Sequence, residues 1–568
     1  MRALDPIWRF TRKNHLALFF GGWFVLNLLQ AGMTELFDDE AYYWAYSNYL
    51  AWGYFDHPPM IALMIKVGYF FFRNELGVRL LTVVLSTATL VVVRKLLPKK
   101  NDALFYAIAC SMAALQIGGI MAVPDIPLLF FSAVFFLQYR RFIRNMSWQN
   151  ALLLGLCMAL MLYSKYHAVL VIGFTFLSYG QLFKKYQTYI AFSTALLLYA
   201  PHLYWEYHYQ FPSLHFHMID RNADGYDVMY TLKYFPEQVL FAGPVAGFPL
   251  LWAAFRYHPK DHFEKALKYT MTGVYIFFLF SSIKGRVEIN WTIPALLPLF
   301  VLSHQYILEN REAWRKWIFR FASATLFLVL IVRVYMIADL SSGIHIDKQD
   351  ELHGNRAWAY SIRQKAGNSP VVFTDSYQYA SKYWFYSGQP SFSLNTPYYH
   401  RNNYNFWPIE NSIFNKTVYV VGDQNRFLLK DSIEAGRGLE GGRLITPYIS
   451  FSGVEIRVPN PVRVAGGMAR NVRLLVLVSD PLTKFTVKPP FNRLPVQMWI
   501  INDDRLEKII NTGLTMEQMT KKENPFMVSF AVDLPPGEYK ARFAIPSAVP
   551  NAATVNSSLI RLRVLRPG

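Results

Sequence analysis

A dense group of acidic side chains directly follows the first long apolar segment of this chain. Asp38, Asp39 and Glu40 are consecutive, and they stand near the start of the stretch FDDEAYYWAYSNYLAWGYFDHPP, residues 37–59. A carboxylate held beside a hydroxyl group can take up its proton as a general base. Three acids beside an apolar segment could equally be a solvated cap on an interfacial helix, because acids cost little when they stay in water. Both interpretations stay open at this point.

Two further charged residues stand alone between apolar runs. Asp125 lies in VPDIPLLFF, where it could act in a polar site or simply be the N-cap of the following helix. Lys165 lies in YSKYH, where its ammonium group could bind a phosphate or could snorkel from the end of a helix. For each residue the two interpretations have about equal weight.

The segment KGRVEINWTIP, residues 284–294, concentrates side chains that suit a phosphosugar. Cations form strong, charge-assisted contacts with phosphate, and the flat face of an indole can stack on a sugar ring. The residues concerned are Lys284, Arg286, Glu288, Asn290 and Trp291. We predict that this segment contributes to substrate binding.

Membrane helices must position these residues. The 568-residue chain is 53% hydrophobic and 17% charged, and soluble globular chains carry a smaller apolar share. Before about residue 340, apolar runs of roughly 16 to 22 residues alternate with short charged stretches, and such runs match the thickness of a bilayer core. We predict about eleven transmembrane helices, over residues 14–32, 76–93, 103–122, 126–139, 149–163, 167–183, 188–204, 236–255, 269–283, 291–308 and 318–339.

Basic residues are distributed unequally between the two sides that these helices define. With a cytoplasmic N-terminus, the inner connections hold 21 basic residues and the outer connections before residue 340 hold eight. Positively charged loops stay in the cytoplasm, so the bias fixes the orientation, and an odd number of helices places the C-terminal region outside. The net charge of +19 therefore reflects topology, and no nucleic-acid partner is predicted. The first segment is expected to be a retained helix, since no cleavage-like motif follows it.

The chain after residue 340 has the pattern of soluble protein. Residues 341–462 alternate strand and helix signals, among them the strand VVFT and the helix SYQYASKYWFYSG, which ends at Gly388, and predict a small α/β domain. Residues 463–568 carry short β-rich runs between turn signals, which predict an Ig-like β-sandwich. The predicted fold class is a polytopic α-helical membrane protein, residues 1–340, with these two extracytoplasmic regions.

Several familiar catalytic motifs are missing. The sequence has no GxxxxGK[ST] loop and no strand-linked GxGxxG, so the use of ATP or a nucleotide sugar is not supported. The histidines show no recognisable metal-ligand spacing. Asp38, Asp39 and Asp125 could hold a divalent cation, but the sequence does not decide whether a metal is present, and no other cofactor is predicted.

The chain resembles the membrane glycosyltransferases that include protein O-mannosyltransferases and the bacterial lipid A aminoarabinose transferase. The most specific common feature is an Asp-Glu pair after the first helix with a Pro-Pro pair about twenty residues later, here Asp39, Glu40, Pro58 and Pro59. The PDxPLL turn around Asp125 and the KxxxExNW-like loop from Lys284 to Trp291 also match. The aminoarabinose enzymes carry cations where this chain has Tyr42 and His57, so the resemblance does not extend to a choice of sugar.

The resemblance implies a polyprenyl-phosphate-sugar donor and an inverting transfer outside the cytoplasmic membrane, with Asp39 as the catalytic carboxylate. We predict Glu40 as the partner of Asp39, and we predict that donor phosphate or sugar contacts come from His57, Lys165, Lys284 and Arg286. Acceptor-binding or site-shaping roles are predicted for Asp38, Tyr42, Asp125, Glu288, Asn290 and Trp291. The acceptor would be lipid A or lipopolysaccharide, another glycan, or a protein.

A transporter or flippase of lipid-linked sugars is the alternative. Transporters place their polar groups at mid-membrane in broken helices and often show repeated halves. In this sequence the polar groups all fall on the predicted outer side, where a lipid-linked substrate presented to the exterior would react. The sequence therefore favours the glycosyltransferase, in the cytoplasmic membrane.

The charge bias gives a first testable prediction. A reporter enzyme that is active only outside the cytoplasm, fused after Gly568, should be active, because 21 inner against eight outer basic residues requires that side for an odd helix count. A fusion within the connection near Arg94 serves as the cytoplasmic control. Cytoplasmic activity of the C-terminal fusion would contradict the predicted topology.

Overall fold

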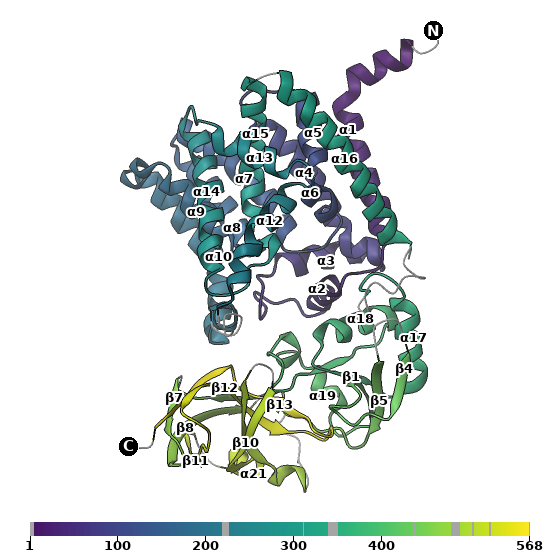
Figure 1. Cartoon of the computed structure of the whole chain (residues 1–568), viewed down its shortest axis with the longest axis vertical. Helices are drawn as coiled ribbons and strands as arrows, with labels where there is room; N and C mark the ends of the chain where they lie inside the picture. The colour runs from purple at the N-terminus through teal and green to yellow at the C-terminus, as the bar shows by residue number, and fades with distance from the viewer. Residues whose placement is uncertain are drawn as a thin grey trace. The chain divides into compact units, whose positions relative to one another are not determined.

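The computed structural model describes residues 5–218, 226–310, 312–338, 350–434, 439–459, 461–478, 489–502, 505–521 and 524–566. The chain divides into two compact units, one made of residues 1–215 and 221–343 and the other of residues 216–220 and 344–568. The first unit is helical, and all the described strands belong to the second (Figure 1).

The helical unit combines long helices with short ones that meet at breaks. Its helices are α1 (Asp5–Met33), α2 (Asp38–Asn48), α3 (Met60–Phe71), α4 (Glu75–Leu96), α5 (Asp102–Ser111), α6 (Ala113–Gly118), α7 (Asp125–Arg144), α8 (Trp148–Ser164), α9 (Ala168–Leu177), α10 (Tyr186–His208), α12 (Val228–Ala242), α13 (Gly247–Arg256), α14 (His262–Ser281), α15 (Leu296–Asn310) and α16 (Glu312–Ile337). The 3-10 turns η2 (Gly180–Lys184) and η4 (Ile289–Ala295) lie between them, and α11 (Pro212–Met218) follows α10.

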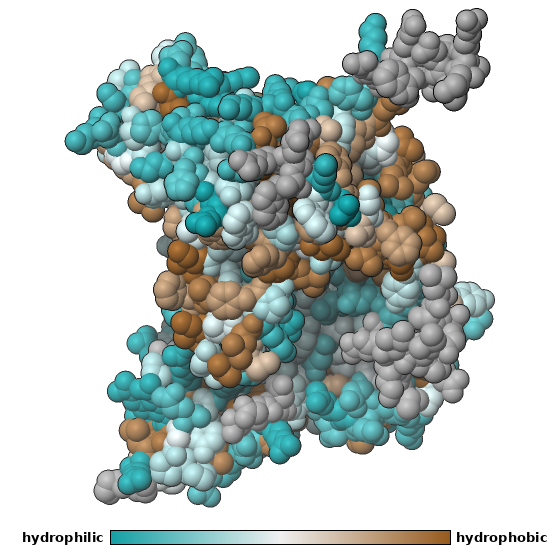
Figure 2. All heavy atoms as spheres, turned by 45° about the horizontal axis from the view of Figure 1, so that its top comes forward, coloured by the Kyte–Doolittle hydropathy of each residue, from teal (hydrophilic) through white to brown (hydrophobic). Residues whose placement is uncertain are grey.

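In the described part of the chain, five helical segments are long and apolar enough to cross a membrane. They belong to α1, α4, α7, the η4–α15 segment and α16, and the bent pair α12–α13 makes a sixth if it forms one span. Figure 2 shows hydrophobic side chains gathered on the surface of the molecule. The exposed large hydrophobic residues include leucines of α10 such as Leu197. Each predicted segment coincides with one helix or a pair of helices. The count of about eleven stays a prediction, because several of these helices are short.

The predicted segment 236–255 is not one unbroken helix, because α12 and α13 meet at an angle of 94°. Two glycines allow the close backbone approach that this bend requires. A Cβ on Gly247 would lie 1.8 Å from the carbonyl oxygen of Val239, and one on Gly243 would lie 2.4 Å from that of Ser111. The predicted segment 103–122 is likewise interrupted at Met112, between α5 and α6. The apolar pattern of the sequence therefore overestimates helix length at both breaks.

Helix packing brings several helix ends to one side of the helical unit. α7 packs against α4 and α8, and α8 packs against α10. Because α4 and α7 begin at the side where α1, α8 and α10 end, residues far apart in the sequence become neighbours there. This shared end carries the short helix α2 and the polar residues that the sequence singles out.

The second unit begins with a small α/β region. Its five-stranded sheet has the order β2-β1-β3-β5-β4, and β1 pairs in parallel with β2 and β3. The elements are α17 (Asn355–Ala366), β1 (Val371–Thr374), α18 (Tyr377–Ser387), β2 (Phe392–Leu394), α19 (Ile409–Ile413), β3 (Val418–Asp423), β4 (Asp431–Glu434) and β5 (Leu439–Ile445). α18 ends at Gly388, whose φ of 72° is a backbone conformation that glycine adopts without strain. The predicted strand VVFT and the predicted helix are both present.

The remainder of the second unit consists of two sheets over one apolar core. A six-stranded sheet follows the order β10-β9-β12-β14-β7 with β13 beside β12, and a three-stranded sheet the order β11-β8-β6. The strands are β6 (Val454–Arg457), β7 (Val462–Ala465), β8 (Ala469–Val478), β9 (Pro495–Asn502), β10 (Arg505–Thr515), β11 (Phe526–Ala531), β12 (Gly537–Pro546), β13 (Ala553–Val555) and β14 (Ile560–Leu565). Leu474 and Phe530 from one sheet and Met498 and Phe543 from the other share the core, as in a sandwich. The boundary predicted between residues 462 and 463 stays a prediction.

Candidate functional site

A buried ion pair between α2 and α4 is the best-connected polar interaction of the helical unit. The guanidinium of Arg79 donates to both carboxylate oxygens of Glu40, at 2.8 Å from Nε and 2.5 Å from Nη2. Glu40 also accepts the backbone N–H groups of Phe37 and Ala122, at 3.0 and 2.7 Å. Both side chains are buried, with 0% exposure for Glu40 and 1% for Arg79. The Glu40 carboxylate is therefore fully engaged in holding the start of α2.

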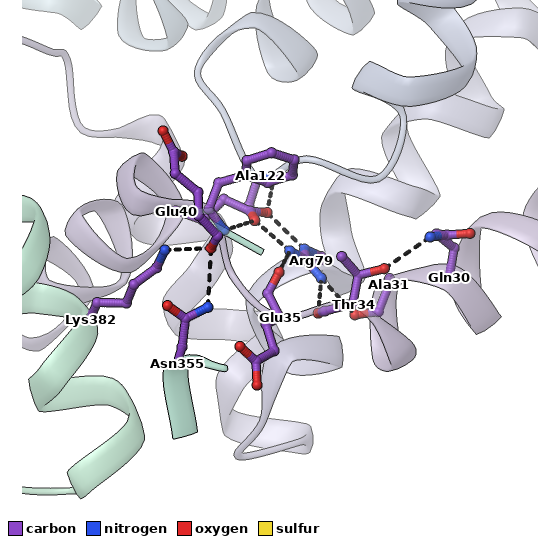
Figure 3. A network of polar contacts seen from close by, with 11 residues as sticks. Gln30, Ala31, Thr34, Glu35, Glu40, Arg79, Ala122, Asn355 and Lys382 are labelled. Carbon is purple, nitrogen blue, oxygen red and sulfur yellow. Dashed lines mark hydrogen bonds and ion pairs between the residues drawn. The ribbon is translucent and has the colours of Figure 1, made fainter. Parts of the chain in front are cut away.

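The remaining donors of Arg79 fix the chain between α1 and α2. Nη1 donates to the carbonyl oxygens of Ala31 and Thr34, and Nη2 donates to that of Glu35. All five N–H groups of the guanidinium are thus used. Figure 3 shows the contacts of Arg79 with Glu40 and with the segment from Ala31 to Glu35, and the contact of Ala122 with Glu40. The sequence predicted Glu40 as a partner of Asp39 but gave no signal for Arg79.

Asp39 lies on the exposed side of α2, whereas its neighbour Glu40 is buried and Asp38 is half-buried. Successive helix residues point about 100° apart, so anchoring Glu40 inward turns Asp39 outward. Tyr43 lies one turn further along α2 and is buried. Burial first, and then the carboxylates of Asp39, Asp56 and Asp125, raise the pKa of Tyr43 well above its ordinary value. Tyr43 therefore stays neutral, and each of the three carboxylates lies close enough to disfavour a negative charge on its hydroxyl group.

Three polar residues from separate segments meet at the ends of α7 and α8. The Lys165 ammonium donates to Oδ1 of Asp125 at 2.7 Å, and the Asn290 side chain donates to Oδ2 at 3.2 Å. Asp125 is the first residue of α7 and Lys165 is the C-cap of α8, so both charges suit the dipoles of their helix ends. Asp125 and Lys165 are buried. The structure thus brings together three of the four regions that the sequence singled out.

The loop before η4 divides into an exposed part and a buried part. Lys284 and Arg286 are exposed, and Arg286 lies 3.6 Å from Glu288 with 72% of its side chain accessible. An exposed pair of this kind contributes little to stability, so both cations are available to a ligand. Trp291 is half-buried and packs against His167 and Phe278, with ring centroids 5.9 and 5.7 Å apart.

The aromatic loop after α2 packs beside Tyr43. His57 makes an edge contact with the ring of Tyr43 at 5.4 Å between centroids, and Tyr42 is buried at an edge contact of 4.6 Å with Tyr46. The Tyr46 hydroxyl donates to Asp56, a carboxylate that the sequence did not single out. His57 therefore lies beside Tyr43, and Tyr42 is buried next to Tyr46.

A second buried polar cluster joins α10 to the loop at Trp52. Nδ1 of His202 donates to the carbonyl oxygen of Trp52 at 2.7 Å, and its Nε2 lies 3.2 Å from the hydroxyl of Tyr166. Glu206, one turn further on α10, lies 3.1 Å from the same hydroxyl and accepts a hydrogen bond from Ser213 at 2.5 Å. Sequence reasoning missed this cluster. The i, i+4 spacing of His202 and Glu206 at the end of an apolar run was the available signal.

No group of three or more His, Cys, Asp or Glu side chains in the described residues is arranged to hold a metal ion. The suggestion that Asp38, Asp39 and Asp125 hold a divalent cation stays a prediction.

Comparison with known proteins gives this geometry a family context. Residues 56–205 match the model of a family described as dolichyl-phosphate-mannose-protein mannosyltransferase. The matched range contains His57, Asp125 and Lys165. The crystal structure of ArnT from Cupriavidus metallidurans in the apo state aligns with 76% of this chain and 98% of that chain, with a TM-score of 0.55 and 14% identity. The resemblance to the protein O-mannosyltransferase- and ArnT-like family is therefore confirmed.

A second structure of ArnT and one curated relative agree with this resemblance. The structure of the same ArnT bound to undecaprenyl phosphate aligns with a TM-score of 0.54, 14% identity and the same coverage of both chains. Lipid A galacturonosyltransferase RgtD from Rhizobium johnstonii is 25% identical over 308 residues, which are 51% of this chain and 64% of that protein. The match thus spans less than two thirds of this relative. At 14% identity, the ArnT structures show that this chain has an ArnT-like fold.

Breaking the buried ion pair should destabilise the helical unit. Arg79→Met removes one partner and leaves the Glu40 carboxylate buried without a counter-charge, which typically costs about 3–5 kcal/mol. Thermal unfolding of the purified protein should show a clearly lowered midpoint. Arg73→Met removes an exposed arginine a few residues away, and its midpoint should match that of the wild type. Equal midpoints for the two variants would show that the ion pair does not anchor α2.

Proposed function

We propose that this protein is an integral membrane inverting glycosyltransferase that moves a sugar from a polyprenyl-phosphate donor to an acceptor outside the cytoplasm. The observation that carries the proposal is the exposed Asp39 on an anchored helix, with the Asp125–Lys165–Asn290 group also near Tyr43. A fixed carboxylate and a set of cations are what displacement at an anomeric carbon requires. The family match and the ArnT-like fold support it.

Asp39 is the proposed general base. The acceptor hydroxyl oxygen attacks the anomeric carbon on the side opposite the phosphate, and Asp39 takes the hydroxyl proton. The bond between the anomeric carbon and the phosphate oxygen breaks, and its electron pair leaves with the polyprenyl phosphate. A single displacement of this kind inverts the configuration of the sugar. Glu40 does not take the proton, because its carboxylate already accepts two hydrogen bonds from Arg79 and two from backbone N–H groups. We assign Glu40 a positioning role.

The cations have separate proposed roles. Lys284 and Arg286 are exposed and stabilise the leaving phosphate, as charge-assisted hydrogen bonds to an anion are stronger than neutral ones. The Lys165 ammonium has three donors and uses one on Asp125. We propose that its other two N–H groups contact the phosphate of the sugar donor and that His57 lies beside the same phosphate. Asp125 and Asn290 hold Lys165 in place, and Trp291 and Glu288 shape the sugar side.

The proposed sugar acceptor rests on the similarity to RgtD, and the proposed membrane orientation rests on the distribution of basic residues. Lipid A is the acceptor named for RgtD, and we propose lipid A or lipopolysaccharide as the first acceptor to test, before other glycans and proteins. ArnT has been crystallised with undecaprenyl phosphate, so an undecaprenyl-phosphate sugar is the first donor to test. We place the protein in the cytoplasmic membrane as a multi-pass protein, with its N-terminus inside and its C-terminal region outside.

The donor class and the base can be tested together. Purified protein should transfer sugar from an undecaprenyl-phosphate donor to lipid A and should be inactive with the corresponding nucleotide sugar. Asp39→Asn should lower the transfer rate by about 10²- to 10⁴-fold, the usual cost of losing a general base, with an unchanged unfolding midpoint. Asp227→Asn is the control and should keep full activity, because Asp227 is an exposed residue that caps α12 and asparagine is an equally good cap. Direct use of the nucleotide sugar would refute the proposed donor, and full activity of Asp39→Asn would refute the proposed base.

The exposed cations predict an effect on donor binding. Arg286→Ala removes a charge-assisted contact of about 1.5–3 kcal/mol, so the donor KM should rise by about tenfold or more with a smaller change in kcat. Raising the salt concentration should reduce the difference between the variant and the wild type, because salt screens exposed charges. Lys66→Ala, another exposed cation of the helical unit, should leave the donor KM unchanged. Steady-state kinetics at two salt concentrations decides the outcome.

A further inference from the structure

Arg333 is a buried cation inside a helix that is apolar enough to cross a membrane. It belongs to the segment Lys316–Ile337 of α16, and only 4% of it is exposed. A charged side chain at such a position is costly unless another group compensates its charge, and such residues often mark functional sites. Nothing in the proposed transfer reaction uses Arg333.

The contacts of Arg333 leave part of its guanidinium without a partner. Nη2 donates to Oδ1 of Asn27 at 2.7 Å and to the carbonyl oxygen of Gln116 at 2.8 Å, and both acceptors are neutral. Nε and Nη1 are buried without a hydrogen-bond partner, and so is Nδ2 of Asn27. Within the described residues, no carboxylate forms an ion pair with Arg333.

Arg79 provides an internal comparison. It is also buried in the helical unit, but it pairs with Glu40 and uses all five N–H donors. Among the described residues, the chain therefore compensates one buried arginine completely and leaves three N–H groups of another without an acceptor and its charge without a counter-charge. An arginine keeps its proton at physiological pH, and no described residue supplies a counter-charge to Arg333, so its guanidinium is a candidate to bind an anion from outside the chain.

The surroundings of Arg333 indicate where that anion comes from. Only 22% of the membrane-length segment of α1 and 28% of that of α16 is buried inside the protein, whereas 83% of the segment Ile289–Asn310 is buried. α1 and α16 therefore expose large apolar surfaces. The exposed apolar residues include Leu26 and Leu29 on α1 and Leu330 and Val334 on α16. The two helices run alongside each other in Figure 1 and contact each other. A lipid molecule of the surrounding bilayer is thus the nearest source of an anion.

The position of Arg333 along the helices fits a lipid headgroup. Gln30 donates from its side chain to the carbonyl oxygen of Arg333 at 3.1 Å and to the Thr34 hydroxyl at 2.9 Å. The carbonyl oxygen of Thr34 accepts a hydrogen bond from Arg79. Arg333 therefore lies near the ends of α1 and α16, on the side that carries α2, where lipid phosphates are found rather than the middle of the acyl chains.

We propose that Arg333 and Asn27 form a binding site for the phosphate of an anionic glycerophospholipid, which enters between the ends of α1 and α16. The unpartnered N–H groups on one edge of the Arg333 guanidinium, together with Nδ2 of Asn27, donate to the phosphate oxygens, and the apolar faces of α1 and α16 contact the acyl chains. Through Gln30 and Thr34 the bound lipid supports the segment that Arg79 holds. Because the proposal does not depend on the transfer reaction, it can be tested without a sugar substrate.

The test measures thermal unfolding of the full chain in nanodiscs of phosphatidylcholine with increasing phosphatidylglycerol. The wild-type midpoint should rise by a few degrees with phosphatidylglycerol, since a ligand that binds only the folded state stabilises it. Arg333→Met should lose this rise. In phosphatidylcholine alone the variant should be at least as stable as the wild type, because it no longer buries an uncompensated charge. Arg73→Met, which removes an exposed cation, should keep the rise.

Native mass spectrometry supplies a second readout and covers the case in which Arg333→Met does not fold. The wild type should retain phosphatidylglycerol in preference to phosphatidylcholine, and Asn27→Leu or Arg333→Gln should retain less. An equal rise in midpoint for the wild type and Arg333→Met would overturn the proposal. Stabilisation through Arg333 by undecaprenyl phosphate but not by phosphatidylglycerol would also overturn it, since the site would then belong to a different class of lipid.

Discussion

The buried ion pair of Glu40 and Arg79 is the interaction on which the arrangement of the candidate site depends. It joins α2 to α4 and, through carbonyl oxygens, to the end of α1. A bare carboxylate or guanidinium would be very unfavourable in this environment, and the pair is tolerable only because each lone pair and each N–H group has a partner. This requirement for complete pairing fixes the rotation of α2. Asp39 then has to face outward, as its proposed role requires.

Antiparallel packing explains why the other polar groups gather at the same end. Helices that alternate in direction bring the start of one and the end of the next to one side, and the dipoles of those ends favour an acid at the start and a base at the end. Asp125 and Lys165 follow this rule and pair with each other. Their charges are therefore compensated within the protein, whereas those of Lys284 and Arg286 face solvent. Compensated charges give the site its shape, and exposed charges remain available for a phosphate.

The two buried arginines of the helical unit show how a membrane protein handles charge in an apolar environment. Arg79 finds its counter-charge within the chain, and the outcome is rigidity. Arg333 has only neutral partners among the described residues, and its charge is left for the surroundings to balance. Internal pairing of Arg79 suits a segment that has to hold Asp39, the proposed base, in a fixed position. The open charge of Arg333 suits a surface that has to recognise the lipids around it.

The sequence by itself determined the class of protein, the approximate position of each apolar helix and most of the polar residues at the shared helix end, because hydrophobic run length and charge type are local properties. It also predicted the strand VVFT, the helix ending at Gly388 and most strands of the C-terminal region, since period-two burial is visible in a single strand. It missed the bend between α12 and α13 and the partners Arg79, Asp56 and Glu206. Only the tertiary structure decided which acid is buried and which is exposed, because adjacent residues such as Asp39 and Glu40 differ in environment through the rotation of their helix against distant partners. That rotation is set by contacts across 39 positions of the chain, a separation that no local pattern records.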